Sequence, residues 1–253
     1  MSWLNGLLIA FASYSRLPVP QAAWTVENRR FSMCFFPLVG AAVGAAAVLW
    51  LWVCDLLNAG PVLRGAVGAV IPLLLTGGIH MDGLMDVTDA MASWQSTDKR
   101  LEILKDSHTG AFAVMMYGGY LLVFAGLMSE MRWADAPLVA AAFVLSRSVS
   151  AMMMTLLPQA RKEGMLADNA RSADQRMVRI ASVIWLTSAV ALILALCGLR
   201  AWMLPLAAAL CGAWYRHRAL KYFGGVTGDQ AGWFVQVAEL AQLAAILLGR
   251  WLG

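Results

Sequence analysis

Long apolar runs, separated by short polar and charged segments, make up most of the chain. A helix that crosses the hydrocarbon core of a bilayer needs about 20 apolar residues. Seven runs approach or exceed that length, and the second and sixth are short or interrupted. They lie at 31–54, 62–79, 111–129, 137–157, 178–198, 201–215 and 232–251. The pattern predicts an all-α polytopic integral membrane protein with about seven transmembrane helices and short interfacial helices.

The composition agrees with a membrane protein and argues against a soluble one. Of 253 residues, 60% are hydrophobic and only 13% are charged, whereas a soluble domain has about 25% charged residues. The mean hydropathy is +0.67. The sequence has no coiled-coil heptads, low-complexity tracts or clear internal repeats. We therefore expect a single membrane-embedded domain over residues 1–253.

The cysteines and the first 20 residues rule out two other interpretations. The four cysteines lie in apolar runs and form no CxxC pair, so neither a zinc site nor a disulfide framework is indicated. Residues 1–20 lack a basic start and a small-residue cleavage site. They predict a short membrane-associated helix that ends at Pro18 and Pro20, and not a signal peptide.

The basic residues predict how the chain is oriented. Fourteen of the 19 Lys and Arg residues lie before the first predicted span or in the second, fourth and sixth loops. Another four, Arg64, Arg132, Arg200 and Arg250, lie on the other side, and Arg147 falls inside a span. Because basic loops stay in the cytoplasm, we expect a cytoplasmic N-terminus and an extracytoplasmic C-terminus. No basic patch carries interleaved aromatic residues, so nucleic acid is not an expected partner.

Three aspartates follow the second apolar run. Asp82, Asp86 and Asp89 are spaced i, i+4, i+7, which places them within about 60° of one another on a helix. No basic residue lies between Arg64 and Lys99 to balance their charge. One interpretation is a solvated acidic helix end. The other, which we favour, is a site for Mg²⁺ or Mn²⁺, because both ions prefer oxygen ligands.

The loop after this cluster contains a fourth acid. The segment from Lys99 to Ser107 has the pattern of an interfacial amphipathic helix. Asp106 lies near the end of this segment, just before the third predicted span. A helix cap explains Asp106 alone, whereas a fourth metal ligand, returned to the cluster by a helical hairpin, explains it together with the other three.

Glycines and a histidine surround the cluster. Gly77 and Gly78 permit a break in the chain or a close approach of the backbone. His80 lies about 160° around a continuous helix from Asp82, so it is not expected to share the metal. A buried structural histidine and a substrate contact or general base remain alternatives for His80.

A second glycine-rich segment, GGVTGDQAG, begins at Gly224. Small residues such as Gly225, together with Thr227, let backbone N–H groups approach a phosphate, although a flexible turn has the same composition. In the helix that follows, Asp229, Gly232, Gln236 and Glu239 fall within about 80° on one face.

Two ionisable residues lie inside predicted spans. Glu239 and Arg147 are expected to face the interior of the helix bundle, where such residues usually serve function. A paired structural arginine is one interpretation of Arg147. An arginine that contacts an anionic substrate is the other, because its planar fork of donors suits phosphate. A divalent-cation site, glycine-rich loops and arginines together favour phosphoryl transfer.

The motifs resemble those of the adenosylcobinamide-GDP ribazoletransferase (cobalamin 5′-phosphate synthase) family. The most specific is GGIHMDGLMDVTDAM at residues 77–91. The others follow in order along the chain: SRLPVP at 15–20, FPLVGAAVGA at 36–45, LKDSHTGAF at 104–112, SR at 146–147, RKEG at 161–164 and TGD at 227–229. Gln236 departs from the acid that family members often carry there, whereas Glu239 matches the acid three residues on.

The resemblance implies a Mg²⁺-dependent enzyme of the bacterial cytoplasmic (inner) membrane that joins the two halves of a cobamide. The ribose 3′-hydroxyl of α-ribazole, or of its 5′-phosphate, would attack the corrinoid-attached phosphorus of adenosylcobinamide-GDP and release GMP. A homo-oligomer and contacts with other cobamide-assembly enzymes are further expected partners.

The resemblance also implies roles for individual residues. Asp82, Asp86, Asp89 and Asp106 would bind Mg²⁺, and Asp229 would be a further ligand or a group that orients the substrate. Arg147, Arg161, Gly225, Thr227 and Glu239 would contact substrate or phosphate. The general base is either His80 or one of the aspartates.

Two other functions fit the sequence less well. A CDP-alcohol phosphotransferase that makes phospholipid also clusters aspartates at a cytoplasmic helix end, but its DG-x2-AR pattern has no Ala-Arg equivalent here, where Asp86 follows Leu84 and Met85. An ion-coupled transporter would place its site near the bilayer midplane, often between inverted repeats. Neither feature is visible in the sequence.

Overall fold

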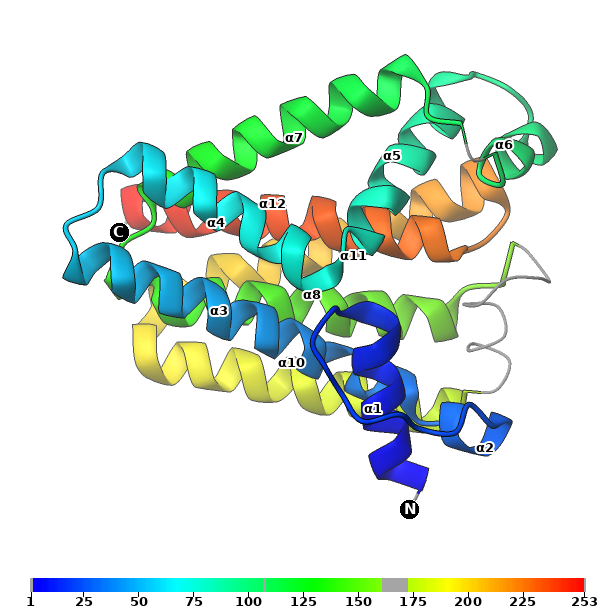
Figure 1. Ribbon diagram of the computed structural model, residues 1–253, viewed down its shortest axis with the longest axis horizontal. Helices are drawn as coiled ribbons and strands as arrows, with labels where there is room; N and C mark the ends of the chain where they lie inside the picture. Colours follow the sequence, from blue (N-terminus) through cyan, green and yellow to red (C-terminus); the bar gives the residue numbers. More distant parts are fainter. Residues whose placement is uncertain (1, 107, 161–172, 253) are drawn as a thin grey trace.

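The computed structural model describes residues 2–106, 108–160 and 173–252, and in these ranges the chain is helical with no strand (Figure 1). The longer helices are α1 (Ser2–Tyr14), α3 (Phe36–Leu56), α4 (Pro61–Thr76), α5 (Ile79–Ala92), α7 (Ala111–Glu130), α8 (Ala136–Leu156), α10 (Gln175–Cys197), α11 (Met203–Phe223) and α12 (Gly228–Leu252). Short helices connect them: α2 (Val26–Arg29), α6 (Thr97–Ile103), and the 3₁₀ helices η1 (Ser32–Phe35), η2 (Trp133–Asp135) and η3 (Gly198–Trp202).

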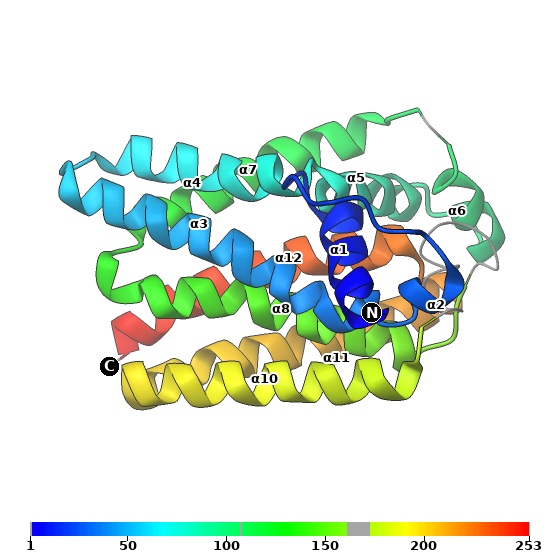
Figure 2. The ribbon, with the colours of Figure 1, turned by 60° about the horizontal axis from the view of Figure 1, so that its bottom comes forward.

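The long apolar helices are of membrane-spanning length. By length and composition, the described residues contain five candidate spans, or six when the bent pair α4–α5 is included as one. One of the five, Gln175–Phe223, contains α10, η3 and α11, and the ribbon reverses direction at η3 (Figure 2). This segment therefore accounts for two of the predicted spans, 178–198 and 201–215. The predicted all-α polytopic membrane fold is confirmed.

The second predicted span is interrupted where the sequence has paired glycines. Helix α4 ends at Thr76, and α5 leaves it at an angle of 96°. Gly77 and Gly78 have φ values of 64° and 81°, a left-handed conformation that glycine adopts without steric cost. The glycine pair thus ends α4 and directs α5, which carries the aspartates, across the bundle.

Helices α8 and α12 form the centre of the bundle. In their most apolar windows, 78% and 72% of residues are buried, against 22% for α7. Helix α8 packs against α3 and α10, whereas α12 packs against α5, α7 and α11. Small residues permit the closest crossings: a Cβ atom at Gly40 would collide with the carbonyl oxygen of Phe143, and one at Gly44 would lie 2.9 Å from that of Ala140. Such contacts are typical of helices that associate inside a bilayer.

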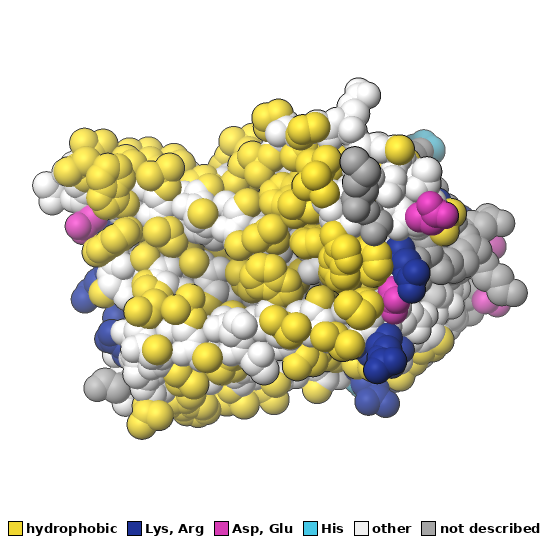
Figure 3. All heavy atoms as spheres, turned by 90° about the horizontal axis from the view of Figure 1, so that it is seen from below, with side chains coloured by type: hydrophobic (Ala, Val, Ile, Leu, Met, Phe, Trp, Pro, Cys, Tyr) yellow, Lys and Arg dark blue, Asp and Glu magenta, His cyan; other side chains and the backbone are white. Residues whose placement is uncertain are grey.

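Charged residues gather at the two ends of the bundle, with a largely apolar face between them (Figure 3). At one end, Arg250 Nη1 lies 2.9 Å from Asp135 Oδ2, and Arg64 Nη1 donates to the Met131 carbonyl oxygen. At the other end, Arg30 Nη2 lies 2.7 Å from Asp174 Oδ2. The basic residues that the loop charges predict to lie on opposite sides of the membrane are therefore at opposite ends of the helix bundle.

Candidate functional site

The candidate site is built where α5 crosses the beginning of α12 (Figure 1). A Cβ atom at Gly83 would collide with the carbonyl oxygen of Asp229, and one at Gly232 would lie 3.2 Å from His80 Cα. Because both crossing points are glycines, the two backbones are nearly in contact. The crossing brings Asp229 beside the helix that carries Asp82 and Asp86.

Asp82 lies in the first turn of α5 and is exposed. It borders a surface hollow of about 370 Å³ that is also lined by Gly77, Gly78, Met85 and Tyr117. The hollow begins at the α4–α5 bend, and its opposite wall comes from α7. Asp82 is thus a predicted metal ligand that a ligand from outside the bundle can reach.

Sequence reasoning did not assign a role to Arg16, which lies beside this hollow. Its backbone N–H donates to the Leu75 carbonyl oxygen at 2.7 Å, and its side chain lies so close to Gly77 that a Cβ atom there would collide with its Nε atom. Arg16 is exposed. The SRLPVP motif was the available signal, but nothing in its spacing indicates that it approaches Gly77.

Asp89 has a structural partner. Its Oδ2 accepts a hydrogen bond from Gly110 N at 2.6 Å, and its Oδ1 accepts one from Ala113 N at 2.9 Å. A Cβ atom at Gly110 would lie 2.7 Å from both carboxylate oxygens. Asp89 therefore satisfies N–H groups at the first turn of α7, where a negative charge is also favoured by the helix dipole.

Asp106 is exposed and interacts within its own loop. Its Oδ1 accepts from His108 N at 3.0 Å and lies 2.6 Å from His108 Nδ1. These hydrogen bonds, that from the backbone first, lower the pKa of Asp106 from its ordinary value. The loop geometry supports the local interpretation of Asp106, although Asp89 does join the beginning of α7 to α5.

The placement of the four predicted aspartate ligands indicates how Mg²⁺ would be held. Among the described residues, no three His, Cys, Asp or Glu side chains form a group that could hold a metal ion. Mg²⁺ is commonly held by one or two carboxylates together with substrate phosphates. Asp82 and Asp86, one helical turn apart on α5, fit that mode, whereas a cage of four aspartates is not formed in this arrangement.

His80 is buried within the bundle. Its side chain is 4% exposed, and its ring lies 5.7 Å from the Phe36 ring, centroid to centroid. Neither ring nitrogen has a hydrogen-bond partner among the described residues. His80 does not line the hollow beside Asp82. This placement favours the interpretation of a buried histidine over that of a general base for an exposed substrate.

Arg147 and Glu239 bind each other. Arg147 Nη1 lies 2.6 Å from Glu239 Oε1, and both side chains are 1% exposed. Arg147 Nη1 also donates to the Phe143 carbonyl oxygen at 3.1 Å. Of the two interpretations of Arg147, the structure supports the paired arginine. Beside this pair, Gln236 Oε1 accepts a short hydrogen bond from the Tyr120 hydroxyl, so the departure from the family's acid is accommodated by a neutral partner.

The second glycine-rich segment is held by local contacts. A Cβ atom at Gly225 would collide with the Pro158 carbonyl oxygen, which accepts from Val226 N at 2.8 Å. Thr227 Oγ1 accepts from Gln230 N at 3.2 Å and so caps the first turn of α12. Gly225 permits a close crossing of two chain segments, and Thr227 positions the helix that begins beside Asp229. Arg161 lies outside the described residues.

The geometry divides the predicted site residues into two groups. Asp82 and Asp86 lie on α5 and Asp229 lies at the start of α12, where the two helices cross, and Asp82 also borders the hollow beside Arg16. Arg147, Glu239 and His80 lie in the buried core beneath. An acidic surface next to an arginine can hold a divalent cation together with a phosphorylated ligand. Such an arrangement suits reactions at phosphorus.

Comparisons with known proteins are consistent over almost the whole chain. Residues 6–247 match the family model described as cobalamin-5-phosphate synthase. A protein of Lachnoclostridium phytofermentans described as adenosylcobinamide-GDP ribazoletransferase is 39% identical over 248 residues, which cover 98% of this chain and 95% of that protein. Proteins with the same description from Pseudomonas aeruginosa and Klebsiella pneumoniae are 32% and 33% identical, covering 97% and 96% of this chain and 98% and 100% of theirs. No solved structure matches significantly.

Proposed function

Because the chain belongs to the cobalamin-5-phosphate synthase family, we propose that it acts as an adenosylcobinamide-GDP ribazoletransferase. The ribose 3′-hydroxyl of α-ribazole, or of α-ribazole 5′-phosphate, forms a new P–O bond to the corrinoid-attached phosphorus. The bond between that phosphorus and the GMP oxygen breaks, and the hydroxyl loses its proton. The products are the cobamide, or its 5′-phosphate, and GMP.

The observation that carries this proposal is the close crossing of α5, which bears Asp82 and Asp86, with the start of α12, which bears Asp229, in a chain that matches the family over residues 6–247. We propose that Asp82 and Asp86 bind Mg²⁺, which neutralises charge on the diphosphate and on the departing GMP. Asp229 orients the attacking hydroxyl, and Arg16 contacts a phosphate oxygen with its guanidinium group.

The residues beneath the crossing have a positioning role in this proposal. The Arg147–Glu239 pair joins α8 to α12. Helix α12 in turn contacts α5 closely at two glycines, Gly83 of α5 and Gly232 of α12. Preorganised groups lower a barrier only when their supports are rigid. The general base is then an aspartate of the crossing, because His80 is buried away from the hollow.

We also propose that the protein resides in the bacterial cytoplasmic membrane, with the N-terminus and the site on the cytoplasmic side and the C-terminus on the other. The supporting observation is the separation of the charged residues to the two ends of the bundle, together with their unequal numbers. Association into a homo-oligomer, or with other cobamide-assembly enzymes, remains a prediction.

The phospholipid-synthase alternative receives no support from the comparisons, which all describe cobamide synthesis. A direct assay separates the two activities. Purified protein is given adenosylcobinamide-GDP, α-ribazole 5′-phosphate and Mg²⁺, and GMP and the cobamide 5′-phosphate are quantified together. We expect equal amounts of both products with the wild type and none with Asp82→Asn. Absence of GMP from correctly folded wild-type protein would refute the assignment.

A further inference from the structure

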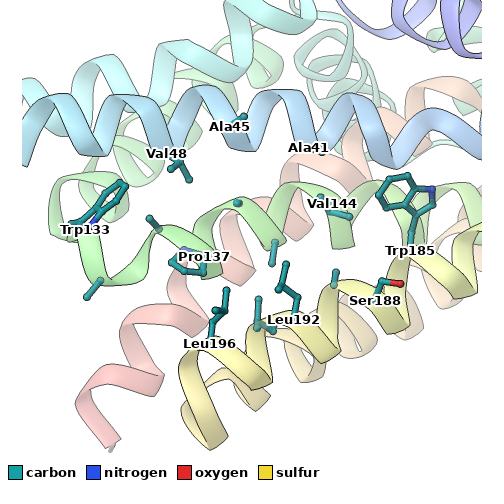
Figure 4. A pocket seen from close by; sticks show the side chains of 16 residues that line it. Ala41, Ala45, Val48, Trp133, Pro137, Val144, Trp185, Ser188, Leu192 and Leu196 are labelled. Carbon is teal, nitrogen blue, oxygen red and sulfur yellow. The ribbon is translucent and has the colours of Figure 1, made fainter.

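A long apolar groove is lined by residues of α3, α8 and α10, and the ribbon shows α3 and α10 on either side of α8 (Figure 2). Both helices pack on α8, which forms the floor. The groove has a volume of about 770 Å³. Its floor is lined by small residues of α8, including Ala136, Ala140 and Ala141, and leucines of α10 form one wall (Figure 4).

The length of the groove matches one leaflet of a bilayer. Along α10 it extends from Trp185 to Leu196, a stretch that covers about 16 Å of helix axis. The hydrocarbon core of a bilayer is about 30 Å thick, so the groove spans close to half of it. The lining residues belong to α3, η2, α8 and α10, which all lie within candidate membrane spans. The groove therefore opens toward hydrocarbon and not toward water.

One end of the groove combines aromatic and cationic groups. Trp133 lines this end, and tryptophan is enriched where hydrocarbon meets headgroups. Arg132 directly precedes Trp133, and Arg200 follows Leu196 by four residues. Both arginines are exposed, and among the described residues neither forms an ion pair with a carboxylate. Arg250, at the same end, is paired with Asp135.

We infer that this groove binds one acyl chain of an anionic phospholipid, whose phosphate lies at Arg132 and Arg200. The apolar walls match the chain, the half-bilayer length matches a single leaflet, and the two guanidinium groups match the phosphate. The small residues of α8 leave a space in the groove that no described side chain fills, and an acyl chain would occupy it. This inference is independent of the proposed activity and of the site on α5.

The test uses two variants with the same chemical change on one helix. Ala189 lines the groove, whereas Ala191 is exposed and lies about 160° from Ala189 around α10. Ala189→Phe adds a ring to the groove, and Ala191→Phe adds the same ring to the outer surface. Phosphatidylglycerol is titrated into each detergent-purified protein, and native mass spectrometry counts the bound lipids.

We expect Ala189→Phe to weaken the tightest phosphatidylglycerol site by roughly tenfold, while Ala191→Phe matches the wild type. If Ala189→Phe does not fold, Ser188→Phe, at an exposed position of the same groove, replaces it. The double variant Arg132→Gln/Arg200→Gln is expected to remove the preference for phosphatidylglycerol over phosphatidylcholine. Equal lipid binding by the two phenylalanine variants would overturn the inference. So would a change from dimer to monomer without a change in bound lipid, which would identify the occupant as a second copy of the chain.

Discussion

The guanidinium group of Arg147 and the carboxylate of Glu239 form a 2.6 Å ion pair at the centre of the bundle, where both side chains are 1% exposed. The pair joins α8 to α12 across 92 residues of sequence. Arg147 Nε and Glu239 Oε2 have no partner among the described residues. The pair is therefore incompletely satisfied, and its two members depend on each other.

Removal of either member should be costly, and removal of both should cost less. Breaking a buried ion pair from one side typically destabilises a protein by about 3–5 kcal/mol, because the other charge is left unpaired. We expect Glu239→Gln and Arg147→Met each to lower the thermal unfolding midpoint strongly. The double variant should unfold above the lower of the two single variants. The measurement is thermal unfolding in detergent, analysed as a double-mutant cycle; additive single effects would contradict a mutually dependent pair.

The crossing of α5 and α12 should not tolerate a methyl group. A Cβ atom at Gly83 would collide with the carbonyl oxygen of Asp229, so Gly83→Ala is expected to move the two helices apart and reduce GMP release at least roughly tenfold. Gly118→Ala is the matched control, because a Cβ atom at Gly118 on α7 has nothing within 4 Å. Full activity of Gly83→Ala would show that the close crossing is not needed for turnover.

The sequence alone predicts the features that depend on neighbouring residues or on composition. The apolar runs predict the spans, and the loop charges predict which residues share an end of the bundle. Gly77 and Gly78 permit the break after α4, because glycine adopts left-handed backbone without steric cost, but a close backbone approach and helix packing were equally open from the sequence. The i, i+4 spacing also places Asp82 and Asp86 one turn apart on α5. Each of these inferences uses only local periodicity or charge.

The remaining features depend on contacts between distant segments. Asp89 shares the spacing of the proposed metal ligands, but it caps α7, whose N-cap residue, Gly110, lies 21 residues later. In the sequence, α2, η1, α3 and α4 separate Arg16 from Gly77, and no periodic pattern indicates that the two residues lie together. The pairing of Arg147 with Glu239 was one of two open interpretations, because the sequence does not show which anion a buried arginine meets.

The contacts of Asp89 lead to a test of its predicted metal role. Asparagine retains one carbonyl oxygen, so Asp89→Asn keeps one of the two N–H acceptors at the start of α7 and loses the negative charge. We expect this variant to be destabilised by about 1 kcal/mol, as for other helix caps, while its activity still saturates at the wild-type Mg²⁺ concentration. Asp86→Asn, one turn away, should instead require more Mg²⁺ or lose activity. The assay is GMP release against Mg²⁺ concentration. A matching shift in Mg²⁺ requirement for Asp89→Asn would restore Asp89 as a ligand.

The final prediction concerns pH and the connection between α2 and α10. Asp174 Oδ2 accepts a hydrogen bond from Arg30 Nη2 at 2.7 Å, and Asp174 Oδ1 accepts one from Met177 N at 3.1 Å at the start of α10. The hydrogen bond from Arg30 and then that from Met177 lower the pKa of Asp174 from its ordinary value. The stabilisation that this carboxylate provides is therefore fully present above the unfolded pKa, about 3.9, and is lost as the pH falls through the lower, folded pKa.

Asp174→Asn keeps an oxygen for the cap but removes the charge. The thermal midpoint of the wild type should exceed that of Asp174→Asn by a constant amount between about pH 6 and 8, and the difference should shrink below about pH 4. Because Asp174 is near the surface, added salt should also reduce the difference at neutral pH. A difference that persists unchanged in acid would mean that Asp174 acts through its shape and not through its charge.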